Sequence, residues 1–212
     1  MRILFQGDSI TDCGRKRSDI NDIGPGYPRY VKQYLNECYP EMEFEFINKG
    51  ISGNQTKDLL ARWQEDAVDL QPDVISILIG ANDTWHHVEK QDWVPNDVFE
   101  SNYRTILEDI KNKTKAKIIM LEPFVLDFPD MTAFHNDIDE KIQIVRRLAR
   151  EYACRYIPLD GLFAAACVSE PPSYWTREGV HPTDEGHKLI ADYYFDALSD
   201  IIEESFIYNE NI

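Results

Sequence analysis

The sequence lacks the marks of a thiol–metal protein, a secreted protein or a membrane protein. Its four cysteines, Cys13, Cys38, Cys154 and Cys167, are scattered, and none forms a C-x-x-C pair. This excludes the usual zinc and redox-dithiol motifs and predicts reduced thiols. No apolar run approaches the length of a membrane span, and an apolar strand predicted from residue 2 leaves no room for a signal peptide. We therefore expect a cytoplasmic protein.

Basic residues are scarce as well. The chain has 22 Lys and Arg against 38 Asp and Glu, a formal net charge of -16. A chain of this charge repels a phosphate backbone and an anionic bilayer, so we expect neither nucleic acid nor a membrane as partner. The sequence also contains no G-x-G-x-x-G, no P-loop and no G-x-S-x-G. A nucleotide-binding protein is therefore disfavoured.

The apolar pattern predicts one α/β domain over residues 1–212. The near-continuous apolar run at 73–79 is typical of a strand that is covered on both faces. Strands are expected at 2–6, 43–48, 73–79, 116–121 and 155–159, and helices at 27–39, 56–70, 96–113, 131–153 and 184–204, with a small helix ending at 167 and a tail at 205–212. Thr56 and Thr183 are the expected N-caps of two of these helices, and loops are expected at 80–83 and 171–182. Alternating strands and helices predict a five-stranded parallel sheet in a three-layer α/β/α sandwich.

Polar residues concentrate in four segments that follow or face the carboxyl ends of these strands, where ligands bind in open α/β sheets. The segments are 7–9, 50–54, 80–83 and 178–182. They contain a serine hydroxyl, Ser9, a histidine base, His181, and a carboxylate, Glu178, that can orient the imidazole ring. The Gly53 N–H and the Asn82 amide can supply the donors that a tetrahedral intermediate needs. The set predicts acyl transfer by a serine nucleophile.

These blocks resemble those of the SGNH (GDSL) hydrolase superfamily. Gly7-Asp8-Ser9, Gly53, Asn82 and His181 match in order and spacing over essentially the whole chain. The runs at 7–15, 48–54 and 82–85 are similar to those of intracellular acetylxylan esterases of that superfamily. The resemblance implies a flavodoxin-like sheet, serine esterase chemistry without a metal or other cofactor, and an acetylated, xylan-derived sugar as substrate. It also implies an oxyanion hole formed by the Ser9 and Gly53 N–H groups and the Asn82 side chain.

One position departs from the family pattern. The family usually has Asp three residues before its histidine, where this chain has Glu178. We predict that Glu178 is the third member of the triad, because the short spacer with Gly179 lets the chain double back toward His181. Asp184, three residues after His181, is the alternative. An acidic residue there is already explained by the dipole of the helix that it begins.

Aromatic residues near the four segments are candidates to stack on sugar rings. Trp85 and Trp175, together with Asp8, are the predicted substrate-binding residues. Trp93 is expected in packing or at a subunit contact, and association into a homo-oligomer is left open.

A metal site and two other functions are weighed against this prediction. His86 and His87, with Asp83 and Glu89 nearby, lack the i,i+4 spacing of a helical ligand pair, so no metal site is predicted. A lysophospholipase or thioesterase on the same scaffold would need a long apolar groove. A carbohydrate-binding protein without activity would follow if Glu178 had broken the triad. Hydrolysis of aryl esters of different chain length separates these alternatives.

Overall fold

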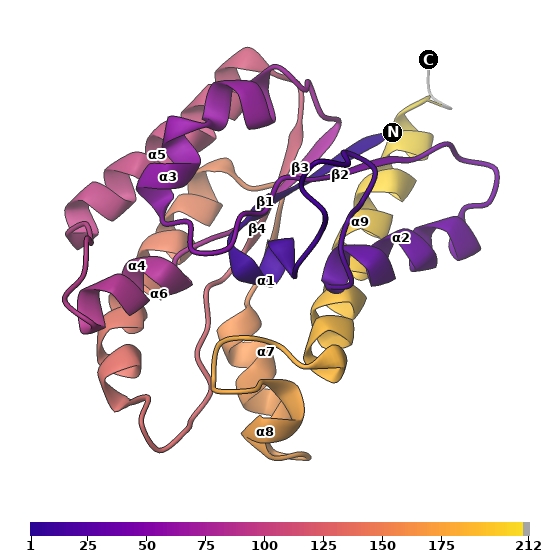
Figure 1. Ribbon diagram of the computed structural model, residues 1–212. Helices are drawn as coiled ribbons and strands as arrows, with labels where there is room; N and C mark the ends of the chain where they lie inside the picture. The colour runs from indigo at the N-terminus through magenta and orange to yellow at the C-terminus, as the bar shows by residue number, and fades with distance from the viewer. Residues whose placement is uncertain (210–212) are drawn as a thin grey trace.

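In the computed structural model, which describes residues 1–209, a five-stranded parallel sheet forms the middle layer (Figure 1). The strands are β1 (Arg2–Gly7), β2 (Glu45–Asn48), β3 (Val74–Leu78), β4 (Lys117–Leu121) and β5 (Arg155–Ile157). Their order is β2-β1-β3-β4-β5, and every neighbouring pair is parallel. Leu4 of β1 lies opposite Ile47 on one side and Ile75 on the other. The predicted sheet is confirmed.

Helices cover both faces of this sheet (Figure 1). On one face lie α2 (Tyr27–Cys38), α7 (Leu159–Ala166) and α9 (Asp184–Asn209); on the other lie α3 (Thr56–Ala61), η1 (Gln64–Val68), α5 (Asn96–Lys113) and α6 (Thr132–Tyr152). Alternate residues of β1 supply the two cores, as expected for a strand buried on both faces. Ile3 and Phe5 pack into the core with α2 and α9, whereas Leu4 packs into the core with α3 and α5. This confirms the three-layer α/β/α architecture.

The helix expected over 56–70 is interrupted, and its N-cap is a different residue from the one expected. Its first part, α3, ends at Ala61, and the π-helical turn η1 follows. The break flanks Trp63, which is buried against α5 with its Nε1–H donating to the Ile106 carbonyl at 3.0 Å. Gln55, not Thr56 as expected, is the N-cap, because the Thr56 hydroxyl is engaged by Asp83 at 2.7 Å.

Three further segments differ from the prediction. The loop expected at 80–83 instead opens a helix, α4 (Ala81–Val88), and the loop expected at 171–182 contains the short helix α8 (Pro172–Trp175). The expected cap at Thr183 is present, since its hydroxyl accepts the Gly186 N–H at 3.2 Å. The last helix, α9, continues to Asn209, so residues 205–209 of the expected tail are helical. Residues 210–212 lie outside the described residues.

The parallel strands bring the chemistry-bearing segments to one edge. Gly7 at the end of β1 pairs with Leu78 at the end of β3, so the residues after both strands are neighbours. The Ile51 N–H donates to the Gly7 carbonyl at 3.1 Å, which adds the segment after β2 to the same edge. The candidate nucleophile, Ser9, lies two residues beyond the end of β1 and is the first residue of α1 (Ser9–Asp12).

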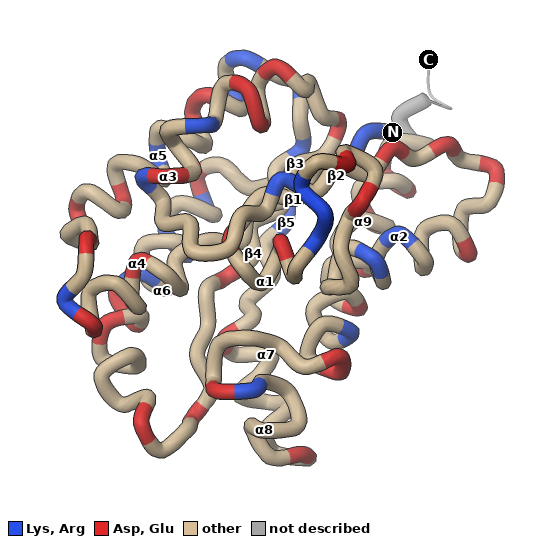
Figure 2. Tube along the Cα trace, viewed as in Figure 1, with Lys and Arg blue, Asp and Glu red and all other residues tan. Residues whose placement is uncertain are grey.

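Acidic and basic residues are interspersed over the outer helices and the connecting loops (Figure 2). The longest basic run is Arg15-Lys16-Arg17, which directly follows the α1 region. Its two arginines lie near the carboxylate of Asp12, so two of its three basic side chains share one acidic partner within the chain. Within residues 1–209, no helix combines the length and the apolar character that crossing a bilayer requires.

Candidate active site

Ser9 stands at the start of the one-turn helix α1, directly beyond β1. The Asp8 carboxylate caps this helix, because its Oδ1 accepts the Ile10 N–H at 3.0 Å. Asp8 is only 1 % exposed, and burial raises the pKa of its carboxyl to about 7 against the opposing hydrogen bond from Ile10. The loop encloses this side chain, and its role in the structure is to cap α1. The substrate contact predicted for Asp8 stays a prediction.

The segment with the acid and the base forms a closed loop. The Arg177 N–H donates to the His181 carbonyl at 2.9 Å, and Thr176 and Pro182 form an isolated antiparallel bridge. Gly179 turns the loop with a φ of +102°, a conformation that other residues rarely adopt. The turn returns the chain on itself, which brings Glu178 beside His181.

The structure joins Ser9, His181 and Glu178 in one chain of hydrogen bonds. The Ser9 Oγ lies 2.9 Å from Nε2 of His181, and Nδ1 of the same ring lies 2.5 Å from Oε1 of Glu178. That oxygen also accepts the main-chain N–H of His181 at 2.9 Å. Because a carboxylate only accepts, Nδ1 carries the ring proton and Nε2 is free to accept the Ser9 hydroxyl proton.

Asp184, the alternative acid, is engaged elsewhere. Its carboxylate accepts the hydroxyl of Tyr30 and pairs with Lys188 Nζ at 3.2 Å. These bonds hold the pKa of Asp184 below its ordinary value. The geometry thus places Glu178, not Asp184, at the imidazole of His181.

Three donors on the segments at this edge of the sheet have a hydrogen without an acceptor among the described residues. Within residues 1–209, the main-chain N–H groups of Ser9 and Gly53 donate to no acceptor. Gly53 has a φ of +86° with open space where a Cβ would lie, so backbone conformation and not crowding requires glycine there. The Asn82 side chain donates one hydrogen to the Asn54 carbonyl at 3.1 Å and keeps a second N–H.

Asn82 is held in place by its neighbour. The Asp83 carboxylate is buried and accepts the Thr56 hydroxyl at 2.7 Å and the Thr56 N–H at 3.1 Å. Burial raises the pKa of Asp83 to about 6, although the Thr56 hydrogen bonds oppose the shift. These hydrogen bonds tie the start of α4 to the start of α3 at Thr56. Asn54, which accepts the Asn82 side chain, lies two residues before Thr56.

A cavity of about 340 Å³ opens beside Ser9. Its lining residues include no acid; they are Ser9, Ile10, Cys13, Gly14, Pro25, Arg177, His181, Pro182 and His187. A cavity of about 390 Å³ between α6 and β5 contains none of the predicted site residues. Arg177 is exposed at the cavity wall, and its guanidinium makes no hydrogen bond or ion pair within the described residues. The sequence prediction missed Arg177, and its place next to Glu178 is the one signal that pointed to it.

The predicted aromatic platforms lie in different environments. The Trp85 ring centroid is 6.1 Å from that of His181, and the half-buried indole packs edge-on against Phe134. Trp175 packs against the core next to α9 and does not line the cavity with Ser9. Trp93 stacks on His87 with a centroid separation of 4.0 Å. Of the two predicted tryptophans, only Trp85 lies beside the triad.

Cys13 and His187 form a second nucleophile–base contact in the same cavity. The Cys13 Sγ lies 3.3 Å from His187 Nε2, but His187 Nδ1 accepts the Tyr27 N–H at 3.2 Å. Burial lowers the pKa of His187 to about 4, so the neutral ring carries its proton on Nε2 and donates it to the sulfur. Burial also raises the pKa of the Cys13 thiol. This pair therefore cannot activate Cys13 as a nucleophile.

No group of three or more His, Cys, Asp or Glu in residues 1–209 is arranged to hold a metal ion. His87, one of the two adjacent histidines, instead pairs with Asp137.

The chain is similar to known hydrolases over most of its length. Residues 5–189 match the model of the GDSL-like Lipase/Acylhydrolase family. An acetylxylan esterase of Geobacillus stearothermophilus is 34 % identical over 198 residues, covering 90 % of each chain. The crystal structure of Axe2, an acetylxylan esterase of that organism, has a TM-score of 0.84 at 33 % identity and covers 92 % of this chain and 93 % of that one. A protein of Parabacteroides merdae described as a GDSL-like lipase has a TM-score of 0.88 at 35 % identity, with 92 % and 94 % covered.

Proposed function

Because the chain belongs to the GDSL-like Lipase/Acylhydrolase family and is a carboxylic ester hydrolase, we propose that it removes acetyl groups from xylan-derived or related acetylated oligosaccharides. The observation that carries this proposal is the Ser9–His181–Glu178 chain, with contacts of 2.9 Å and 2.5 Å. The similarity to acetylxylan esterases over most of the chain supports the acetyl ester as substrate. The four free cysteines support a reducing compartment, the cytoplasm.

The proposed reaction has two halves and passes through an acetyl-enzyme. Ser9 Oγ attacks the acetyl carbonyl while His181 Nε2 takes its proton, and Glu178 stabilises the imidazolium through Nδ1. The carbonyl oxygen, now an oxyanion, accepts the N–H groups of Ser9 and Gly53 and the free N–H of Asn82. His181 then gives the proton to the sugar oxygen, which leaves. A water molecule, activated by the same ring, releases acetate and restores the Ser9 hydroxyl.

The cavity beside Ser9 is where we place the leaving sugar. The leaving oxygen must lie near Nε2 of His181, and this cavity is lined by both Ser9 and His181. Arg177 offers a fixed fork of N–H donors at its wall, which suits neighbouring sugar hydroxyls. The Trp85 ring centroid lies 6.1 Å from that of His181, and this indole is the proposed surface on which a sugar face stacks. Neither nucleic acid nor a membrane enters this reaction.

The alternative of a carbohydrate-binding protein without activity rested on Glu178. That argument loses its basis, because the glutamate reaches Nδ1 of His181. The lysophospholipase or thioesterase alternative differs in the length of its acyl group. The rates on esters of different acyl length distinguish it from the proposal.

A series of 4-nitrophenyl esters tests the proposed substrate. The kcat/KM should fall from acetyl to butyryl to octanoyl, and acetylated xylo-oligosaccharides should release acetate. Ser9→Ala should fold normally and lose activity by several orders of magnitude, about 10⁴-fold or more. An octanoyl ester that is hydrolysed as fast as the acetyl ester would move the substrate to long acyl chains. Turnover by Ser9→Ala above about a tenth of wild type would remove Ser9 as nucleophile.

A further inference from the structure

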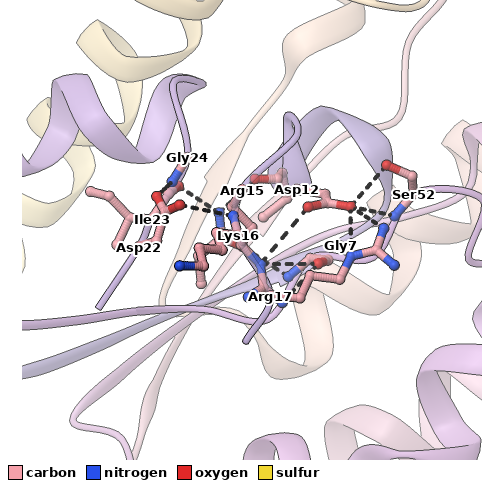
Figure 3. A network of polar contacts seen from close by, with 12 residues as sticks. Gly7, Asp12, Arg15, Lys16, Arg17, Asp22, Ile23, Gly24 and Ser52 are labelled. Atoms are coloured by element: carbon pink, nitrogen blue, oxygen red, sulfur yellow. Dashed lines mark hydrogen bonds and ion pairs between the residues drawn. The ribbon is translucent and has the colours of Figure 1, made fainter. Parts of the chain in front are cut away.

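A buried carboxylate, Asp12, connects the segment that carries Gly53 to the turn that carries Ser9 (Figure 3). Asp12 is the last residue of α1 and is 1 % exposed. Its Oδ2 accepts the main-chain N–H and the hydroxyl of Ser52, both at 2.9 Å. The Ser52 N–H belongs to the preceding peptide plane and the hydroxyl to the side chain, so the two bonds together hold the Ser52 Cα, from which the Ser52–Gly53 peptide plane with the Gly53 N–H begins.

The charge on Asp12 strengthens this link. Burial opposes ionisation of the carboxyl, but the hydrogen bonds from Arg17 and Ser52 outweigh it and hold the pKa below its ordinary value. Arg17 Nε donates to the same oxygen at 3.2 Å. Hydrogen bonds to an ionised acceptor are roughly twice as strong as those between neutral groups. The carboxylate is therefore a firm anchor for Ser52.

The segment needs such an anchor because Ser52 and Gly53 are exposed to solvent. Its other backbone bonds lie at its two ends, where the Ile51 N–H donates to the Gly7 carbonyl and the Asn54 N–H donates to the Ile51 carbonyl. Arg15 adds a second connection from the α1 side, donating to the Gly50 carbonyl at 3.1 Å and 3.3 Å. Asp12 makes the contact that reaches the residue next to Gly53.

We propose that Asp12 is a positioning residue, which acts through Ser52 to hold the Gly53 N–H where it and the Ser9 N–H bind the same oxyanion. This inference rests on the proposed function. The two donors come from segments that are more than 40 residues apart in the sequence. Their separation is therefore set by the contact between those segments, not by local backbone geometry. Loosening the link weakens binding of the transition state more than binding of the ground-state ester, so kcat falls and KM changes little.

The test compares Ser52→Ala, Asp12→Asn and the double variant with wild type on 4-nitrophenyl acetate. Asp12→Asn should lower kcat about tenfold or more at nearly constant KM, since a donor misplaced by about 1 Å loses most of its effect. Ser52→Ala should lower kcat roughly threefold, because the main-chain bond to Asp12 remains. The two losses should not add in the double variant, since both remove the same link. The affinity for a short alkylboronic acid, whose oxygen takes the oxyanion position, should fall in parallel.

Two matched controls separate positioning from general stability. Arg17→Met removes one partner of Asp12 but leaves Arg15 and both bonds to Ser52, so at alkaline pH, where the Asp12 carboxyl is ionised, kcat should equal that of wild type even if the melting temperature falls. Asp22→Asn changes a carboxylate of the same region that accepts only the Lys16 and Gly24 N–H groups, at 2.8 Å and 2.9 Å, and should leave kcat unchanged.

Three results would overturn the inference. A loss of kcat in Arg17→Met equal to that in Asp12→Asn would reduce the role of Asp12 to stability. A loss confined to KM, or losses that add in the double variant, would also contradict it. If Asp12→Asn does not fold, Ser52→Ala and Arg17→Met decide the question between them. Wild-type turnover is measured first, so an absence of esterase activity is recognised as failure of the proposed function itself.

Discussion

Glu178→Gln removes the charge of the residue that holds His181 but keeps its length and one carbonyl oxygen. In the structure a single atom, Oε1, accepts both the Nδ1–H of His181 at 2.5 Å and the main-chain N–H of the same residue at 2.9 Å. A glutamine carbonyl can accept both bonds, whereas its NH₂ group can accept neither. We therefore expect glutamine to place its oxygen there, so that Nδ1 stays protonated and the tautomer is kept.

The loss of activity is then the loss of charge assistance. Hydrogen bonds to charged groups contribute about 1.5–3 kcal/mol and neutral ones about 1 kcal/mol, a difference of about 0.5–2 kcal/mol. At about 1.4 kcal/mol per tenfold in rate, kcat should fall roughly 2- to 30-fold. The side chains of Glu178 and His181 are each 41 % exposed, so solvent screening moves the expectation toward the lower end. Glu178→Ala leaves no acceptor and frees the ring to take either tautomer, so a loss of about 10³-fold or more is expected.

The assay is steady-state hydrolysis of 4-nitrophenyl acetate, with circular dichroism to show that each variant is folded. Asp184→Asn is the matched control, and it should keep nearly full kcat because its carboxylate serves Tyr30 and Lys188. An inactive Asp184→Asn beside a fully active Glu178→Gln would transfer the role to Asp184. Full activity of Glu178→Ala would show that Ser9 and His181 work as a dyad.

Three further predictions concern other parts of the site. Asn82→Ala should lower kcat by roughly 100-fold or more at nearly constant KM, and a loss seen only in KM would make Asn82 a substrate contact instead. Arg177→Gln should lower kcat/KM for acetylated xylo-oligosaccharides about tenfold by loss of charged hydrogen bonds and leave 4-nitrophenyl acetate unaffected; equal losses on both would refute a sugar contact. Asp8 titrates near 3.8 in the unfolded chain and at about 7 in the folded one, so its burial costs stability as the pH rises through that window. Urea unfolding should therefore show Asp8→Asn gaining stability relative to wild type between about pH 4 and about pH 8, and a constant difference would contradict the argument.

The sheet could be predicted from the sequence because each strand is covered on both faces. A run such as 73–79 has few alternatives when it is almost entirely apolar. The ends of helices were predicted less well where a tertiary contact decides them. Trp63 interrupts the helix after α3 because its indole is buried against α5, and Thr56 gives up the cap because its hydroxyl serves Asp83. Neither partner is near in sequence.

The predicted members of the site differ in how far the sequence could locate them. Ser9, Gly53 and Asn82 follow strands, so the topology alone brings them to one edge. Glu178 was placed by the short spacing to His181, which the turn at Gly179 makes effective. Asp8 was predicted to bind substrate, but burial is a property of the packed loop that the motif does not reveal. Trp175 likewise packs toward the core next to α9, which its place in the same segment as His181 did not indicate.

Three buried carboxylates explain how four separate segments keep one geometry. Asp8 caps the turn that carries Ser9, Asp12 holds the segment that carries Gly53, and Asp83 ties the start of α4, which carries Asn82, to Thr56. Each accepts main-chain N–H groups, which fixes backbone where the oxyanion donors need it. Asp8 and Asp83 have no arginine or lysine within hydrogen-bond reach among residues 1–209, and burial raises both pKa values, whereas Arg17 beside Asp12 has the opposite effect. Burial of Asp8 and Asp83 therefore costs stability as the pH rises from about 3.8 to about 7 and about 6, respectively, whereas the ionised Asp12 contributes stability above about 3.8.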